Sequence, residues 1–171
     1  MASEEHLLKC GWVFSIQQYG PWKLIDTVQF ESVECFWKAY EFMPKSSVAF
    51  RVSDNVTRSF FKHGVDRIRS ICMRRDTIKS LEWEDPLNVG MFSFRLEDKD
   101  SRTVDDMYEQ LLLLAVGETF GDGVRAIRIV DKGKKRSICT QYEIWCNGES
   151  KDVLNVLSGI YEKKVEWTAF E

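Results

Sequence analysis

Five acidic residues gather in one short part of the chain and are the first candidates for chemistry. They are Asp98, Asp100, Asp105, Asp106 and Glu109. Carboxylates grouped in this way could hold Mg²⁺ for nucleotide hydrolysis. A helix start explains the same acids, because the helix dipole favours negative charge there, and no histidine base accompanies them. We therefore expect no catalytic residue, metal or cofactor, and we keep a nucleotide-processing enzyme as the less favoured alternative.

Cysteine spacing and net charge exclude two further classes of site. The five cysteines form no Cys-x-x-Cys pair and are odd in number, which predicts neither a zinc site nor a disulfide framework. The formal net charge of -3 argues against a protein that covers nucleic-acid phosphates with Lys and Arg. Aromatic residues are abundant instead, at 13% with six Trp, and they need a role.

The elements that would position a binding site form a mixed pattern of strands and helices. Trp12, Phe14 and Ile16 alternate with smaller residues, which is typical of a strand. Further extended runs cover residues 22–30, 91–96, 124–130, 138–145 and 165–170. Because helices separate these strands without βαβ alternation, the pattern predicts an α+β fold around an antiparallel sheet.

Capping residues and apolar periodicity predict three helices in a single domain. The first follows Ser32, the second starts after Thr103 and stops at Gly117, and the third begins near Ser150. No linker or internal repeat divides the chain, so we expect one domain over 1–171. The first residues lack the apolar run of a signal peptide or membrane anchor, so we expect no membrane association.

Several short motifs follow one another in an order that a known family shares. They are His6-Leu7-Leu8-Lys9-Cys10-Gly11-Trp12, Phe30-Glu31-Ser32-Val33-Glu34-Cys35-Phe36-Trp37, Ser59-Phe60-Phe61-Lys62-His63-Gly64-Val65, Trp83-Glu84-Asp85, Gly117-Glu118-Thr119-Phe120 and Ile144-Trp145. In this order they resemble the translation initiation factor 4E family. The resemblance implies a strongly curved antiparallel sheet of about eight strands with three helices on its convex face. It also implies a concave slot for the 7-methylguanosine cap of messenger RNA.

The resemblance assigns the aromatic residues of that slot. In the family, two rings enclose the methylated guanine, and Trp83 matches one of them. Trp22 matches the other if two residues are deleted, and Tyr19 is the alternative. A guanine methylated at N7 is cationic, so the face of an indole attracts it. Glu84 matches the carboxylate that accepts hydrogen bonds from the guanine edge.

Basic residues are expected to bind the cap phosphates. Arg128 matches a phosphate-binding Arg of the family and faces away from its apolar neighbours in a predicted strand. Arg95 is the substitute for a second family Arg. The hairpin tip adds Lys132, Lys134 and Lys135, although a basic hairpin is more often a solvated turn.

A basic segment around 66–82 departs from the family pattern. We expect an inserted loop beside the slot, with Ile68, Ile71 and Cys72 at the spacing of a short helix. Its basic side chains would either hold RNA phosphates beyond the cap or point into water on the rim. They are Arg67, Arg69, Arg74, Arg75 and Lys79.

The convex face is expected to bind a protein partner. In the family a helix from a scaffold protein, or from repressors that mimic it, docks on this face. The matching residues here are Val33, Trp37, Leu113 and Gly117. Glu109 stands where the family has an apolar residue, and Gln110 where it has a carboxylate, so the identity of the partner stays open.

The resemblance therefore predicts a monomer that binds capped messenger RNA and supports translation initiation. The alternative retains cap binding but makes the protein a translational repressor. The reduced cysteines favour a cytoplasmic location, with the nucleus as a second possibility.

Overall fold

The structure is a computed structural model, which describes residues 5–18, 24–50, 68–82, 84–85, 88–96, 101–133 and 139–170. Its strands are β1 (Leu7–Gln18), β2 (Leu24–Ser32), β3 (Ile68–Arg75), β4 (Gly90–Leu96), β5 (Val124–Asp131), β6 (Thr140–Cys146) and β7 (Glu166–Ala169). Its helices are α1 (Val33–Phe42), α2 (Ser46–Phe50), α3 (Ser101–Val116) and α4 (Lys151–Ile160).

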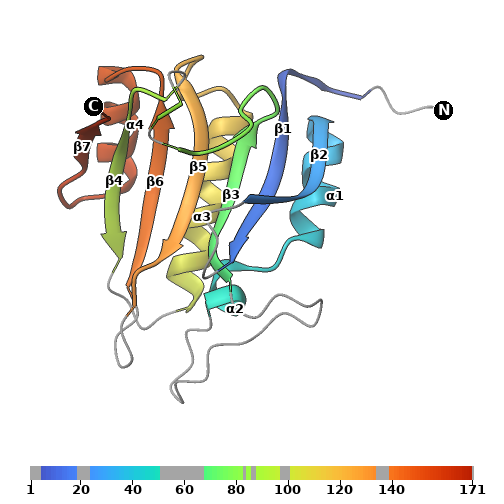
Figure 1. Ribbon diagram of the computed structural model, residues 1–171, viewed down its shortest axis with the longest axis horizontal. Helices are drawn as coiled ribbons and strands as arrows, with labels where there is room; N and C mark the ends of the chain where they lie inside the picture. The colour runs from blue at the N-terminus through green and yellow to red at the C-terminus, as the bar shows by residue number, and fades with distance from the viewer. Residues whose placement is uncertain are drawn as a thin grey trace.

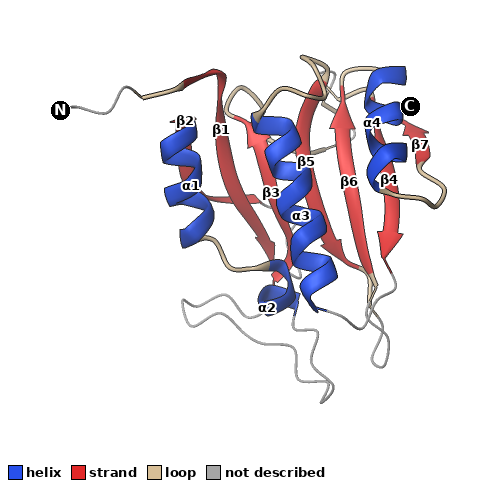
Figure 2. Cartoon of the chain, turned by 180° about the vertical axis from the view of Figure 1, so that it is seen from behind, coloured by secondary structure: helices blue, strands red, loops and turns tan. Residues whose placement is uncertain are grey.

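The strands form one curved sheet in the order β2-β1-β3-β5-β6-β4-β7 (Figure 1). Every pairing is antiparallel. The three longer helices, α1, α3 and α4, cover one face of the sheet, as Figure 2 shows. We call this convex side the helix face and the opposite, concave side the open face. The arrangement confirms the α+β prediction, with seven strands among the described residues where about eight were expected.

Serine side chains begin two of the helices, as the sequence predicts. The Ser32 hydroxyl accepts a hydrogen bond from the Cys35 amide at 3.3 Å, which caps α1. The Ser150 hydroxyl accepts one from the Val153 amide at 3.4 Å, which caps α4. Each hydroxyl satisfies an amide that has no acceptor within its own helix.

The predicted start of α3 is wrong by three residues. The helix begins at Ser101, so Thr103 lies inside its first turn and does not precede it. Packing against the sheet explains the difference, because Val104 is fully buried and its carbonyl accepts a hydrogen bond from the Tyr142 hydroxyl at 3.0 Å. A tertiary contact therefore outweighs the local capping signal.

The core lies between the sheet and the three helices. Alternating residues of the strands point toward the helices, and Phe14, Ile71, Ile127 and Ile144 are all fully buried there. On the helix side, α3 contributes Leu111 and others to the same cluster. Burying one such side chain contributes about 1.5–3 kcal/mol, so this cluster fixes the curvature of the sheet and the shape of its open face.

The prediction of a basic loop around 66–82 is wrong for residues 68–75. Residues 68–75 form β3, which lies between β1 and β5 inside the sheet. The helix-like spacing of Ile68 and Ile71 has a different cause. The pairing register between β1 and β3 changes at one point, because Gln17 pairs with Ser70 whereas the next residue, Gln18, pairs with Ile68. This irregularity lets two isoleucines three positions apart both face the core.

The open face is polar along most of its strands. Hydroxyl, amide and charged side chains from β1, β3, β5 and β6 lie there, and a small apolar cluster of Cys72, Ala126 and Trp145 lies among them. Among the described residues, no helix has the length and apolar character needed to cross a membrane.

Candidate binding site on the open face

A pocket of about 170 Å³ opens on this face between the sheet and the segment that follows β3. Figure 1 shows that segment crossing the open face in front of β5 and β6 before it reaches β4. The pocket is lined by Gln17, Leu24, Lys79, Ser80, Leu81, Glu82 and Arg128. Leu24 and Leu81 also pack on the Cys72, Ala126 and Trp145 cluster, so two apolar side chains stand among the mostly polar residues of the pocket lining.

Arg128 lies in this pocket but is held by other side chains. Its Nη1 atom donates to Glu143 Oε2 at 3.2 Å, its Nε atom donates to the Ser70 hydroxyl at 3.1 Å, and Nη2 donates to Gln17 Oε1. A guanidinium has five N–H donors, so these bonds leave two. The predicted phosphate role of Arg128 stays a prediction, and any phosphate would meet a cation already paired with Glu143.

Glu143 organises the polar side chains around Arg128. Its carboxylate also accepts hydrogen bonds from Gln141 Nε2 at 2.9 Å and from Trp145 Nε1 at 3.1 Å. The side chains of Arg128 and Glu143 are only 8% and 4% exposed. A buried pair of this kind is stable only when the remaining polar atoms are also satisfied, and these neighbours supply most of the bonds.

The aromatic residues expected to enclose the cap fall outside the described residues, as do Tyr19, Lys134 and Lys135. Trp22 and Trp83 are, however, close in sequence to residues that line the pocket. Leu24 follows Trp22 by two residues, and Glu82 directly precedes Trp83. Glu84 is described and is exposed. The pocket lining therefore includes described residues that are close in sequence to both members of the predicted aromatic pair.

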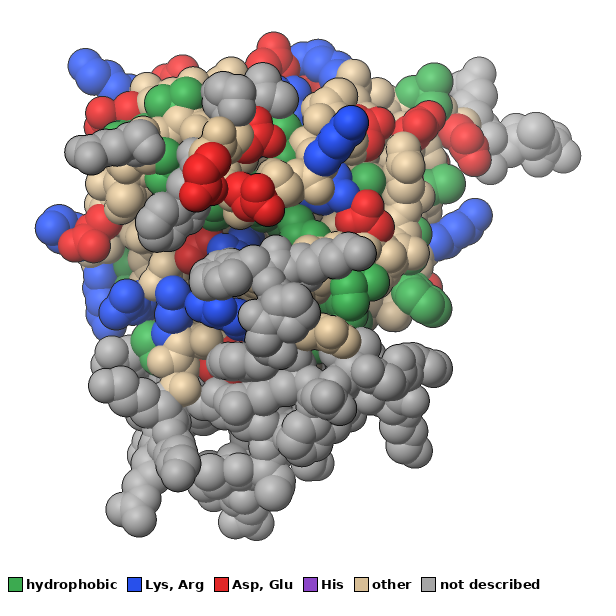
Figure 3. Space-filling model, viewed as in Figure 1, with side chains coloured by type: hydrophobic (Ala, Val, Ile, Leu, Met, Phe, Trp, Pro, Cys, Tyr) green, Lys and Arg blue, Asp and Glu red, His purple; other side chains and the backbone are tan. Residues whose placement is uncertain are grey.

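The remaining described basic candidates lie away from the pocket lining. Arg95 is exposed and its Nε atom donates to Gln141 Oε1 at 3.0 Å, which joins it to the side chains around Glu143. Lys132 is exposed just after β5. Figure 3 shows basic and acidic side chains side by side on this face, so the described surface is not uniformly positive.

The two arginines expected to contact RNA beyond the cap are engaged within the protein. Arg74 is 4% exposed and bonds to Asp26 and to the Ile78 carbonyl. Arg75 donates to the Val124 carbonyl at 2.8 Å and its guanidinium lies 5.7 Å from the Trp12 ring centre. The RNA role is thus wrong for Arg74, which is buried, and stays a prediction for the half-buried Arg75 and for Lys79, which is exposed at the pocket.

The expected partner residues lie on the helix face. The side chains of Trp37 on α1 and Leu113 on α3 are 41% and 39% exposed. Val33 is half-buried, and Gly117, just beyond α3, is exposed. Glu109 accepts a hydrogen bond from the Tyr40 hydroxyl at 2.9 Å, which joins α1 to α3. Burial of the Tyr40 side chain raises its pKa above the usual range, and this hydrogen bond contributes in the same direction to a smaller extent.

The acids considered for Mg²⁺ have structural partners where they are described. Asp105 accepts hydrogen bonds from the Ser46 hydroxyl and the Ser47 amide at 2.8 Å, and Asp106 lies 3.7 Å from Arg102. Glu109 holds Tyr40, as above, and Asp98 and Asp100 fall outside the described residues. Within the described part of the chain, no three His, Cys, Asp or Glu side chains gather closely enough to hold a metal ion.

Sequence analysis missed Gln17 and Glu143, which hold Arg128. Glu143 gave a usable signal, because it is a single acid among the apolar residues of a predicted strand. Such an acid faces away from Tyr142 and Ile144, on the same side as a basic residue of the neighbouring strand. Gln17 gave no comparable signal, since a glutamine near a strand end is ordinary.

Comparisons with known proteins identify relatives. The sequence model of the family named eukaryotic initiation factor 4E matches residues 12–165. The solved structure of Ascaris suum eIF4E-3 with m7G cap matches with a TM-score of 0.73 and 17% identity, over 98% of this chain and 93% of that one. The same protein with m2,2,7G cap gives 0.73 and 16%, over 98% and 93%.

A third structure holds a protein partner. Caenorhabditis elegans eIF4E-3 with the 4E-binding protein Mextli and a cap analog matches with a TM-score of 0.71 and 17% identity, over 96% of this chain and 92% of that one. At such identities the structural likeness shows the fold. Among curated proteins, no sequence matches this chain significantly.

Proposed function

This chain belongs to the eukaryotic initiation factor 4E family, and we propose that it binds the 7-methylguanosine cap of messenger RNA on its open face and supports translation initiation. The observation that carries the proposal is that the pocket lining includes described residues next to both predicted rings in sequence. Leu24 follows Trp22 by two residues, and Glu82 directly precedes Trp83. Relatives of the same fold include Ascaris suum eIF4E-3 with an m7G cap.

The proposed affinity for the methylated base rests on stacking. Methylation at N7 gives the guanine ring a positive charge, and an indole face attracts such a cation by about 2 kcal/mol or more when water is excluded. Trp83 and Trp22 are the proposed rings, with Tyr19 as the alternative to Trp22. The apolar side chains of Leu24 and Leu81 in the pocket lining support this proposal, because they would exclude water from a stacked base.

Guanine is proposed to be distinguished from adenine by Glu84. The N1 and N2 atoms of guanine both donate hydrogen bonds toward one edge, and a carboxylate can accept both at once. Each hydrogen bond to a charged group contributes about 1.5–3 kcal/mol. The exposure of Glu84 supports the role, since its carboxylate is accessible to a ligand.

The phosphates are proposed to extend toward the basic side chains of this face. Lys79 and Arg128 line the pocket, and Arg95 and Lys132 lie further along the sheet. Because Glu143 already offsets the charge of Arg128, we propose that Lys79 contributes more to phosphate affinity than Arg128 does. A flexible lysine at the surface also suits a triphosphate whose position varies.

The helix face is proposed to bind a scaffold protein or a repressor that mimics it. The exposed Trp37 and Leu113 would contact an amphipathic helix of that partner. C. elegans eIF4E-3, which shares the fold, is solved with the 4E-binding protein Mextli. We propose that the protein is a cytoplasmic binding protein that performs no chemical step. A pull-down of partners with wild type and with Trp37→Ala distinguishes two cases. An active factor retains a scaffold protein that the variant loses, whereas a protein that only occupies caps retains none.

Equilibrium titration with 7-methyl-GTP, followed by tryptophan fluorescence, tests the site. Trp83→Ala should remove most of the binding, because a stacking platform is worth about 1–3 kcal/mol per base. Glu84→Gln should weaken binding by about 2 kcal/mol, since the amide places a donor against a donor. Trp37→Ala is the matched control, because its ring lies on the opposite face. Equal affinity in all four proteins, each shown to be folded, would reject the site.

A further inference from the structure

Arg74 makes contacts that its position in a central strand does not require. It lies near the end of β3 on the open face, with its side chain 5% exposed. Its Nη2 atom donates to both carboxylate oxygens of Asp26, at 2.6 and 2.7 Å, and its Nη1 atom donates to the Ile78 carbonyl. The Nη1 and Nη2 atoms of one guanidinium thus bond to two separate parts of the chain, β2 and the segment after β3.

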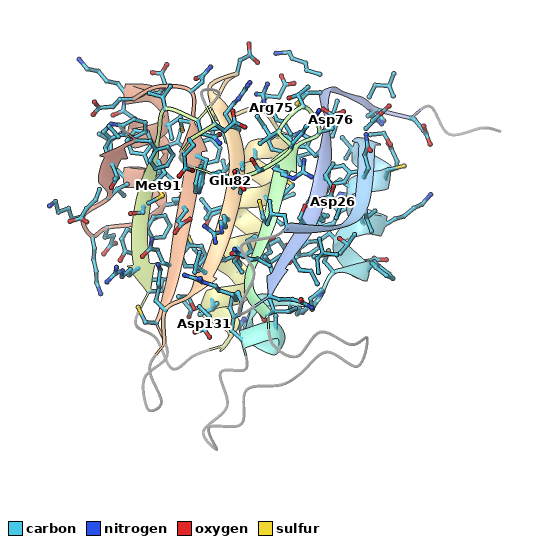
Figure 4. The ribbon with its side chains drawn as sticks, viewed as in Figure 1. Asp26, Arg75, Asp76, Glu82, Met91 and Asp131 are labelled. Atoms are coloured by element: carbon cyan, nitrogen blue, oxygen red, sulfur yellow. The ribbon has the colours of Figure 1, made fainter. Side chains whose placement is uncertain are left out.

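The two partners of Arg74 do not line the pocket themselves, but each is close in sequence to residues that do, and we call these two parts of the lining the β2 wall and the 78–82 wall. Asp26 is on β2, two residues after Leu24, which lines the pocket. Ile78 directly precedes residues 79–82, which line it from the other side. Figure 4 shows Asp26 beside the outer strands and Glu82 in front of the middle of the sheet.

The sheet itself does not connect these two walls. β1 separates β2 from β3, so Arg74 reaches across an intervening strand to meet Asp26. Ser15 of β1 lies along this path and donates its own hydroxyl to Asp26 at 2.8 Å, which fixes the carboxylate. On the other side, residues 76–82 form no strand. The Asp76 amide donates to the Gly11 carbonyl at 3.0 Å and Asn88 Nδ2 donates to the Glu82 carbonyl at 3.2 Å, so these bonds hold the two ends of the segment, and Arg74 contacts it between them, at Ile78.

The contact is poorly explained by stability alone. Arg74 is almost fully buried, whereas Asp26 is 57% exposed, so the protein desolvates a cation to hold a carboxylate that water could solvate. The Nε atom of Arg74 is also buried without a hydrogen-bond partner among the described residues. Replacing both members of a buried ion pair by apolar side chains is often neutral for stability.

We propose that Arg74 is a positioning residue that sets the width of the cap pocket by holding the β2 wall and the 78–82 wall at a fixed separation. This inference rests on the proposed function, because it explains how a slot for a flat base keeps its shape before the base arrives. Preorganisation of this kind raises affinity, since less order is lost on binding. An arginine is needed, because a lysine has no planar fork to reach a carboxylate and a carbonyl together.

The experiment compares cap affinity, stability and local motion in four variants of the full chain. Arg74→Lys and Arg74→Met remove the two-sided contact. Asp26→Asn weakens only the β2 side and serves if an Arg74 variant does not fold. Arg75→Met is the matched control, because it removes the neighbouring arginine, which contacts Trp12 and the Val124 carbonyl instead.

We expect Arg74→Lys and Arg74→Met to weaken 7-methyl-GTP binding by about tenfold or more, with a faster dissociation rate, while Arg75→Met stays within about twofold of wild type. Without any ligand, the amide hydrogens of residues 79–82 should exchange faster in Arg74→Lys than in wild type. Asp26→Asn should show a smaller loss of affinity in the same direction.

Two results would overturn the inference, and they are distinguishable from failure of the proposed function. If wild type binds the cap analogue and folded Arg74 variants bind it equally well, Arg74 does not position the pocket. If hydrogen exchange at residues 79–82 is unchanged in Arg74→Lys, the walls are held by something else. If wild type itself does not bind, the proposed function fails, and the exchange measurement still decides whether Arg74 holds the segment.

Discussion

Removing Glu143 should strongly destabilise the protein, because it leaves a buried cation without its counter-charge. In Glu143→Ala, Arg128 would lose its ion pair at 3.2 Å while its side chain stays 8% exposed. Trp145 Nε1 and Gln141 Nε2 would each lose an acceptor as well. Breaking a buried pair from one side costs about 3–5 kcal/mol.

The lower end of that range is the better estimate here. Arg128 keeps its bonds to Gln17 and Ser70 in the variant, so part of its charge remains solvated by the protein. We therefore expect a loss of about 3 kcal/mol from a total free energy of unfolding of about 5–15 kcal/mol. Urea denaturation followed by circular dichroism measures this difference directly.

The double variant Glu143→Leu with Arg128→Met supplies the control. It removes both charges, so no buried cation is left unpaired, and it should be more stable than Glu143→Ala alone. A loss below about 0.5 kcal/mol in Glu143→Ala would show that Arg128 does not depend on Glu143. A double variant as unstable as the sum of the two single variants would contradict the reasoning too, because the two sites would then act independently.

Three further predictions concern local features. Ser150→Ala should cost about 1 kcal/mol through loss of the α4 cap, and an unchanged urea midpoint would show that the Val153 amide finds another acceptor. The hydrogen bond from His6 lowers the pKa of Glu34 from 4.5 to about 2, so the stabilisation is present above pH 4.5 and is lost as pH falls toward 2. In His6→Ala an NMR titration should find the Glu34 pKa raised from about 2 but still below 4.5, because the backbone amides of Glu34 and residue 6 continue to donate to the carboxylate, and a pKa that stays near 2 would assign the whole effect to those amides. Burial raises the pKa of the Cys72 and Cys146 thiols to about 12, so thiol reagents at neutral pH should label them only after unfolding, and rapid labelling of the native protein would refute this.

Local signals predicted the fold best where they agreed with tertiary packing. Ser32 and Ser150 both cap helices, and the alternation of Trp12, Phe14 and Ile16 corresponds to β1. β3 was missed because two features concealed it. Arg74 placed a charge in a buried strand, where it is neutralised by Asp26 from a strand that is distant in sequence. The register irregularity near Ile68 also produced a helix-like spacing.

The candidate site depended even more on contacts between distant segments. The resemblance predicted a slot on the concave face, and the pocket lining includes Leu24 and Glu82, which are close in sequence to the expected Trp22 and Trp83. The hydrogen-bond partners of Arg128 could not be predicted from the sequence of β5 alone, because Gln17, Ser70 and Glu143 belong to three other strands. The sequence likewise could not show that Glu109 on α3 is bonded to Tyr40 on α1.

The most direct test of the central claim is selective elution of the wild-type protein from a 7-methylguanosine affinity resin. The fixed positive charge of the methylated base is the feature that stacking between indoles recognises, so free 7-methyl-GTP should release the protein. GTP at the same concentration should leave it bound, because the unmethylated base lacks that charge. Failure to bind the resin, or equal release by GTP and 7-methyl-GTP, would contradict cap recognition by this protein.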